Sequence, residues 1–119
     1  MSKMFYGYYN LASLDVSNFD TSQVTDMEGM FGHCSGLTSL DLSGLDTSQV
    51  KNMMYMFTEC SGLTSLDLSS FDTSQVTNMS YMFCDSDKLA NIYVGSGWRE
   101  AAEKTDMFKN CGTDHVTVR

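Results

Sequence analysis

Polar residues recur every 26 positions along this chain, in columns whose side chains are able to contact a partner. One column holds aspartates and its two neighbours hold mainly serines. In an alternating β-strand all of them share one outward face, and a strip of carboxylates and hydroxyls suits a cationic partner. Equally, Ser and Asp keep an exposed sheet in solution, so both interpretations stay open. The columns are Ser13/Ser39/Ser65/Asn91, Asp15/Asp41/Asp67/Tyr93 and Ser17/Ser43/Ser69/Gly95, and the first two give the candidate ligand-binding residues.

A second acidic column consists of Asp20, Asp46 and Asp72, each followed by Thr and Ser. Calcium takes six or more oxygen ligands that converge on one point, whereas each of these turns offers a single carboxylate. Side chains of Asp, Thr and Ser also satisfy nearby backbone N–H groups in turns. Local hydrogen bonding is therefore the favoured interpretation, and no metal or cofactor is expected.

The four cysteines do not form a C-x-x-C pair, so zinc has little support. Cys34 and Cys60 hold equivalent positions 26 residues apart, which would bring them within reach of a disulfide if the units lie side by side. Small buried hydrophobes inside a turn are the favoured alternative. Ser86 takes the equivalent position in the next unit, and Cys84 falls two positions earlier.

Residues for catalysis are scarce. His33 aligns with Glu59 and Asp85 in later units, which indicates exposed surface, and His115 is not tied by a known motif to any nucleophile. The methionine columns align with phenylalanines at turn spacing and predict core packing and not a soft-metal site. We therefore expect no enzyme. The columns are Met27/Met53/Met79 and Met4/Met30/Met56/Met82/Met107.

The apolar residues within a unit show which elements carry these columns. Leu37-x-x-Leu40-x-Leu42 ends in strict alternation, which predicts a strand with one buried face. Val50, Met53, Met56, Phe57 and Cys60 then follow at a spacing that suits one or two helical turns, or an extended piece that enters such a turn.

A single unit cannot bury its own apolar face, so successive units must stack and share one core. The resulting prediction is an α/β fold: a leucine-rich-repeat-type solenoid of 26-residue coils, with a parallel sheet on one face and short helical turns and loops on the other.

One domain, residues 1–119, is expected. Residues 1–10 form a partial first coil, residues 11–36, 37–62 and 63–88 form full repeats, and residues 89–119 form an atypical C-terminal capping coil. In this last coil residues 98–104 favour a helix with Trp98, Ala101, Ala102 and Thr105 on one side, and residues 116–118 predict a final strand.

Fifteen acidic and seven basic residues give a formal net charge of −8. This charge disfavours nucleic-acid and membrane-surface partners, and a cationic partner is electrostatically easier. No run of about 18 apolar residues occurs, so no membrane insertion is expected. The first residues lack the apolar core of a signal peptide, so any export signal would lie outside this chain.

Residues 71–83 read Phe-Asp-Thr-Ser-Gln-Val-Thr-Asn-Met-Ser-Tyr-Met-Phe, with near copies at residues 19–31 and 45–57. Residues 60–66 continue as Cys-x-x-Leu-x-x-Leu, and residues 92–98 read Ile-Tyr-Val-x-x-Gly-Trp. Together these motifs resemble the BspA-like leucine-rich-repeat family of bacterial surface proteins over nearly the whole chain. The resemblance implies display on a bacterial cell or secretion from it, and some relatives act in adhesion and host-protein binding.

The predicted function is a non-catalytic recognition or adhesion module that binds a host or matrix protein, or another surface protein, through the sheet face. The alternative is a passive structural spacer, with calcium stabilisation as a further possibility. The sequence predicts neither the ligand nor the oligomeric state.

Overall fold

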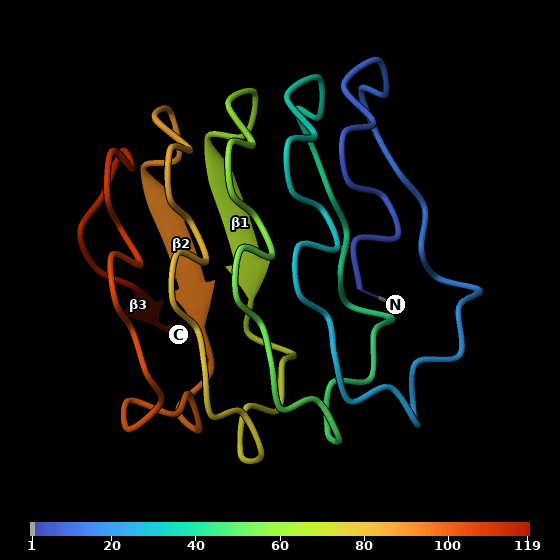
Figure 1. The fold of residues 1–119 in the computed structure, drawn as a ribbon, viewed down its shortest axis with the longest axis vertical. Helices are drawn as coiled ribbons and strands as arrows, with labels where there is room; N and C mark the ends of the chain where they lie inside the picture. Colours follow the sequence, from blue (N-terminus) through green and yellow to red (C-terminus); the bar gives the residue numbers. More distant parts are fainter. Residues whose placement is uncertain (1) are drawn as a thin grey trace.

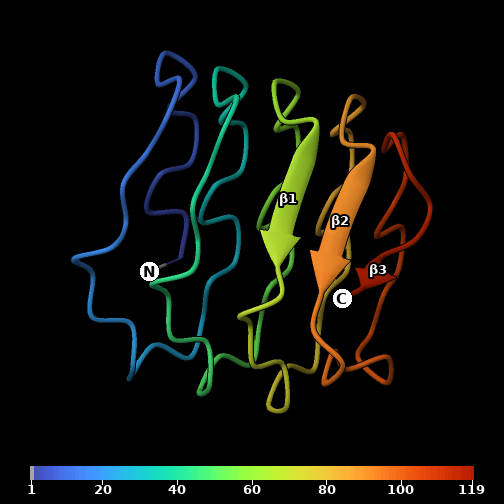
Figure 2. The ribbon, with the colours of Figure 1, turned by 180° about the vertical axis from the view of Figure 1, so that it is seen from behind.

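The computed structural model describes residues 2–119, in which each coil of the chain lies beside the preceding one (Figure 1). Strands β1 (Ser65–Leu68), β2 (Asn91–Val94) and β3 (Thr117–Val118) form a parallel sheet in that order. Leu66 pairs with Ile92, so the register joins residues 26 positions apart. Figure 2 looks onto this sheet. We call this the sheet side, residues 11–17, 37–43, 63–69, 89–95 and 116–118.

The first two coils pair more sparsely on the sheet side. A single parallel bridge joins Asp15 to Asp41, and the Thr38 N–H donates to the Ala12 carbonyl. This pairing sets Leu14 beside Leu40, and both side chains are only half-buried. No bridge joins residues 37–43 to residues 63–69 within the described part of the chain. Regular strands therefore form only in the C-terminal half of the sheet.

The opposite side of each coil, which we call the turn side, spans residues 2–8, 28–34, 54–60, 80–86 and 105–111. Here backbone N–H groups donate to carbonyls of the following coil, as in the 3.0 Å bond from Phe31 to Met56. Phe5, Phe57 and Phe83 donate in the same way to Met30, Met82 and Met107. A further line of parallel bridges, Asp26/Asn52/Asn78/Glu103, joins the coils where they enter the turn side.

The helical part of the sequence prediction does not hold, because residues 2–119 contain no helix. Along residues 50–60 the backbone instead makes tight turns. One of them is closed by the hydrogen bond from the Met56 N–H to the Met53 carbonyl. Tyr55 and Glu59 adopt left-handed φ angles of 59° and 52°, which end any helix. Their N–H groups bond to the next coil, so pairing between coils replaces the internal bonds of a helix.

The expected helix at residues 98–104 is also absent. The Glu103 N–H donates to the Thr77 carbonyl, and Glu103 bridges Asn78 in parallel. Trp98 and Ala102 are buried as expected, whereas Ala101 and Thr105 are exposed. Seven residues gain little as an isolated helix, so pairing with the preceding coil determines their conformation.

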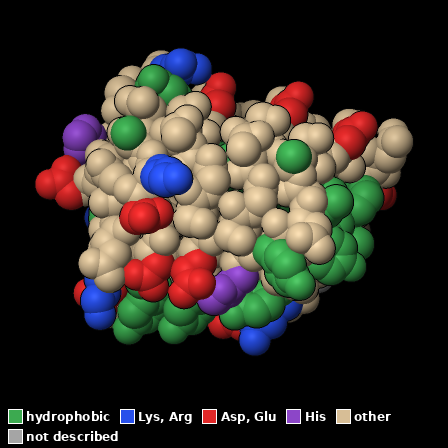
Figure 3. Space-filling model, turned by 90° about the horizontal axis from the view of Figure 1, so that it is seen from above, with side chains coloured by type: hydrophobic (Ala, Val, Ile, Leu, Met, Phe, Trp, Pro, Cys, Tyr) green, Lys and Arg blue, Asp and Glu red, His purple; other side chains and the backbone are tan. Residues whose placement is uncertain are grey.

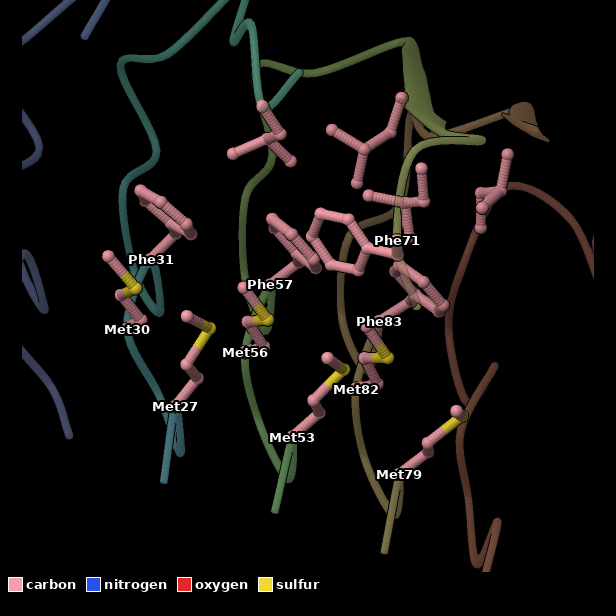
Figure 4. Close-up of a cluster of buried hydrophobic side chains, with 14 of the residues drawn as sticks. Met27, Met30, Phe31, Met53, Met56, Phe57, Phe71, Met79, Met82 and Phe83 are labelled. Carbon is pink, nitrogen blue, oxygen red and sulfur yellow. The ribbon is translucent and has the colours of Figure 1, made fainter. Parts of the chain in front are cut away.

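The core lies between the two sides and is built from columns of equivalent residues in successive coils (Figure 4). The rings of Phe31 and Phe57 stack with centroids 5.6 Å apart and planes 7° from parallel. The same stacking runs from Phe5 to Phe108 at centroid distances of 5.6–5.8 Å. Met27, Met30, Met53, Met56, Met79 and Met82 are fully buried beside this column.

Buried hydroxyls and thiols connect the coils and explain the polar motif of the repeat. The Thr47 hydroxyl donates to the Asp72 carbonyl at 3.0 Å and accepts from the Asp72 N–H at 2.9 Å. Thr21 makes the same pair of bonds to Asp46. Each bond satisfies a backbone group that the corner of the coil would otherwise leave unpaired.

Candidate functional site

The sheet side presents the predicted candidate residues to solvent. In β1, Ser65 and Asp67 are exposed whereas Leu66 and Leu68 are buried. The other candidates follow this alternation: Ser13, Asp15, Ser39, Asp41 and Asn91 are exposed, and Tyr93 is half-buried. This alternation therefore turns the eight residues outward on the sheet side, and we call the surface they form the acidic face.

Pairing between coils brings these residues together. Asp15 bridges Asp41, Ser65 lies opposite Asn91, and Asp67 lies opposite Tyr93. A shallow hollow of about 410 Å³ opens at the N-terminal end of the face. It is lined by Ser13, Leu14, Asp15, Ser17, Ser39 and Asp41.

The carboxylates of the acidic face are already engaged by the backbone. The Asp41 carboxylate accepts the Ser43 N–H at 3.0 Å and the Ser43 hydroxyl at 2.7 Å. Hydrogen bonds from the Ser43 side chain and backbone lower the pKa of Asp41, although the nearby Asp15 and Asp67 charges oppose this. Asp15 and Asp67 accept from Ser17 and Ser69 in the same way, and their pKa values are also lowered. The face is therefore anionic at neutral pH and keeps free acceptor lone pairs.

Arg119 lies on the acidic face, a feature that the sequence analysis missed. The guanidinium carbon is 3.7 Å from the centroid of the Tyr93 ring, and Nη1 is 3.3 Å from the Asp67 carboxylate. The Arg119 N–H donates to the Val94 carbonyl, which fixes the residue beside β2. Strand alternation could have predicted the side of the sheet on which Arg119 lies, because Arg119 follows Thr117 by two positions and Thr117 pairs with Tyr93.

The second acidic column makes turns at the corner of each coil. The N–H groups of Ser22, Ser48 and Ser74 donate to the carboxylates of Asp20, Asp46 and Asp72 at 2.9–3.0 Å. Bonds from these serines lower the pKa of each aspartate. Residues 2–119 contain no group of three His, Cys, Asp or Glu side chains arranged to hold a metal ion.

All four cysteines are free thiols. The Cys60 thiol donates to the Phe31 carbonyl at 3.1 Å, and Cys34 donates equivalently to Phe5. Ser86, which stands in the same column, donates to the Phe57 carbonyl at 2.6 Å. Burial raises the pKa of Cys60 to about 12, so this thiol is protonated and unreactive at neutral pH.

Both histidines contact a carboxylate. His33 Nδ1 lies 2.7 Å from Glu59, and its ring lies 4.7 Å from that of Tyr6. The sequence alignment of His33 with Glu59 signalled this contact, because residues 26 positions apart become neighbours. His115 Nδ1 lies 2.9 Å from Asp114, where both side chains are largely exposed.

The chain matches the family model described as "Mycoplasma protein of unknown function, DUF285" over residues 1–117. It belongs to this family. No curated protein and no solved structure matches the chain. Within residues 2–119 this DUF285 member has no helix of the length and apolarity that crossing a bilayer requires.

Proposed function

We propose that this DUF285 member is a non-catalytic recognition module on a bacterial cell-surface or secreted protein. It would be a leucine-rich-repeat solenoid of the BspA-like variety, and its acidic face would bind a host or matrix protein, or another surface protein. The observation that carries this proposal is the guanidinium of Arg119, which lies over Tyr93 and against Asp67.

Arg119 supports the proposal because it shows which chemical group this face accommodates. A guanidinium that contacts both a tyrosine ring and a carboxylate combines cation–π attraction with a charged hydrogen bond. The hollow lined by Asp15 and Asp41 offers further carboxylates with no basic residue among its lining. A partner with arginine or lysine on its surface would make contacts of the same kind with the other carboxylates of the face.

Long-range electrostatics favour the same class of partner. The formal charge of −8 attracts basic proteins and accelerates their encounter with the face. Ions screen such attraction between exposed groups, so the proposed binding must weaken as salt concentration rises.

The test is a binding screen of the purified chain against extracellular-matrix and mucosal proteins, at low and high salt. A hit is then measured with a triple variant, Asp15→Asn, Asp41→Asn and Asp67→Asn, in which the amide oxygens still accept the serine N–H groups. The control is the triple variant Asp20→Asn, Asp46→Asn and Asp72→Asn, which removes equal charge from the corners. We expect the first variant to lose about tenfold or more in affinity and the control to lose much less. Equal losses in both variants would show that net charge, and not the face, determines binding.

A passive spacer is the second candidate, and one observation favours it. Each carboxylate of the acidic face already accepts hydrogen bonds from the serine two residues later, so the aspartates have a structural role without any ligand. A spacer predicts no binding to any partner in the screen. If calcium stabilises it, its melting temperature rises with calcium and falls with a chelator.

A further inference from the structure

A second surface lies on the turn side, where left-handed residues form two columns. The non-glycine residues of both columns are exposed or half-buried. One column is Lys3/Gly29/Tyr55/Tyr81/Asp106 and the other is Gly7/His33/Glu59/Asp85/Asn110, all with φ between 50° and 80°. Non-glycine residues adopt this conformation at a cost of about 1 kcal/mol or more. The backbone conformation is therefore energetically unfavourable at each non-glycine position of the two columns.

Two of the five positions of the first column are tyrosines, Tyr55 and Tyr81, and the position before them is Gly29. The rings of Tyr55 and Tyr81 stack with centroids 4.9 Å apart and planes 5° from parallel. The equivalent position in the preceding coil is Gly29, which has no side chain to cover Tyr55. Tyr55 is accordingly 37% exposed.

A hollow of about 300 Å³ lies at this position. Gly29 and Tyr55 are both in its lining and Tyr81 is not, so the hollow reaches the end of the stacked tyrosine pair at Tyr55. Tyr6 and His33, whose rings are in contact, line another part of the hollow. A flat group entering here would lie between aromatic side chains.

Carboxylates line the same hollow. Glu59 and Asp85 belong to its lining and also to that of an adjoining hollow of about 370 Å³, which includes Asp87. Figure 3 shows acidic side chains in a row beside a histidine and hydrophobic groups along one edge of the molecule. Within the two linings the only Lys or Arg is Lys3, whose ammonium lies 5.7 Å from the Tyr6 ring centroid. The surroundings therefore favour a planar cation.

We propose that this hollow is a binding site for the guanidinium group of an arginine in a basic segment of a partner protein. The guanidinium would stack on the ring of Tyr55 beside Gly29, and Glu59 and Asp85 would accept its N–H groups. Arginine meets both requirements because its group is planar, cationic and rich in donors. The site is separate from the acidic face and does not depend on the function proposed for that face.

The site is tested by two-dimensional NMR of the ¹⁵N-labelled chain, titrated with a hexa-arginine peptide. Hexa-lysine of the same length is the control for charge alone. We expect hexa-arginine to shift the amide signals of Gly29, Tyr55 and Glu59, with an affinity several-fold higher than that of hexa-lysine. Shifts confined to the acidic face, absence of binding, or equal affinity for the two peptides would overturn the proposal.

Three variants examine the parts of the site. Gly29→Tyr would place a third tyrosine next to Tyr55 and fill the hollow; its Cβ would lie 3.1 Å from Cγ of the flexible Lys3 side chain, and Tyr55 and Tyr81 already adopt the required φ. Tyr55→Leu removes the aromatic face, and Glu59→Gln removes one charge. We expect each to weaken hexa-arginine binding by about 3- to 30-fold.

Matched substitutions outside the hollow are Tyr9→Leu, at an exposed tyrosine, and Asp41→Asn on the acidic face. Neither is expected to change binding at Gly29 and Tyr55. The spectra also report whether each variant is folded. If Gly29→Tyr does not fold, Tyr55→Leu and Glu59→Gln still decide the matter, because unchanged affinity in both contradicts the proposed contacts.

Discussion

The turn side and the sheet side carry the same repeat but hold the coils together differently. On the turn side, Phe31 and Phe57 are fully buried, and their stacking and backbone bonds recur from coil to coil. On the sheet side, Leu14 and Leu40 remain half-buried, and the first coils share only one bridge. The two sides of one repeating unit therefore do not pack equally.

The difference indicates a division of roles. Close packing makes the turn-side columns sensitive to every change of volume, whereas the acidic face consists of exposed side chains that can vary at little cost to the fold. A repeat of this kind can keep its buried columns constant while its exposed residues vary. The following predictions measure how far that division extends.

The largest expected effect is at the centre of the phenylalanine column. Phe57→Ala removes a fully buried ring that stacks on both Phe31 and Phe83, so unfolding free energy should fall by about 3–5 kcal/mol. Leu40→Ala on the sheet side should cost roughly 1 kcal/mol, because that side chain is half-buried. Urea unfolding followed by circular dichroism measures both, and equal losses would remove the distinction between the two sides.

A smaller effect is expected at the corner that joins the two sides. Thr47→Val keeps the shape of the side chain but leaves the N–H and the carbonyl of Asp72 without their partner. We expect a loss of about 1–3 kcal/mol in unfolding free energy. Thr64→Val is the matched control, because Thr64 is exposed. A Thr47 variant as stable as this control would mean that the corner hydroxyls do not hold the coils together.

The smallest effect concerns acid stability. The folded-state pKa values of Asp15, Asp41 and Asp67 lie below the ordinary carboxyl value because serines donate to these carboxylates. Their contribution is therefore complete above an unfolded pKa of about 3.9 and is lost as pH falls through the folded-state values. The melting temperature should fall as pH is lowered from ~5 to ~2, and fall less in the variant with Asn at all three positions. An equal fall in both proteins would show that these hydrogen bonds do not stabilise the ionised carboxylate relative to the protonated form.

The sequence was most informative where the repeat is uniform. The 26-residue spacing of Leu66 and Ile92 correctly predicted their pairing, and the alternation around Asp67 correctly predicted which side chains are exposed. The conformation of the turn side, where tight turns replace the predicted helical turns, could not be predicted in this way. A spacing of three residues fits both a helix and successive tight turns, and only the bonds between coils decide between them.

The candidate sites show the same limit. Repetition placed the aspartates on one face, but the position of Arg119 depends on how the shortened last coil returns to β2. The hollow beside Tyr55 lies where Gly29 stands in place of the tyrosine of the next two coils. The sequence alone does not reveal the role of a residue that departs from the repeat, because that role depends on the neighbouring coils.

Units 26 residues long lie in register on one another, and deletion of one whole unit tests this register most directly. Removal of residues 37–62 joins Gly36 to Leu63 and recreates the junction that Gly62 and Leu63 already make. This protein should remain folded and unfold cooperatively at a lower temperature, whereas removal of residues 37–49 alone, half a unit, should abolish cooperative unfolding. If both deletions behave alike in thermal unfolding, the coils do not share the register described here.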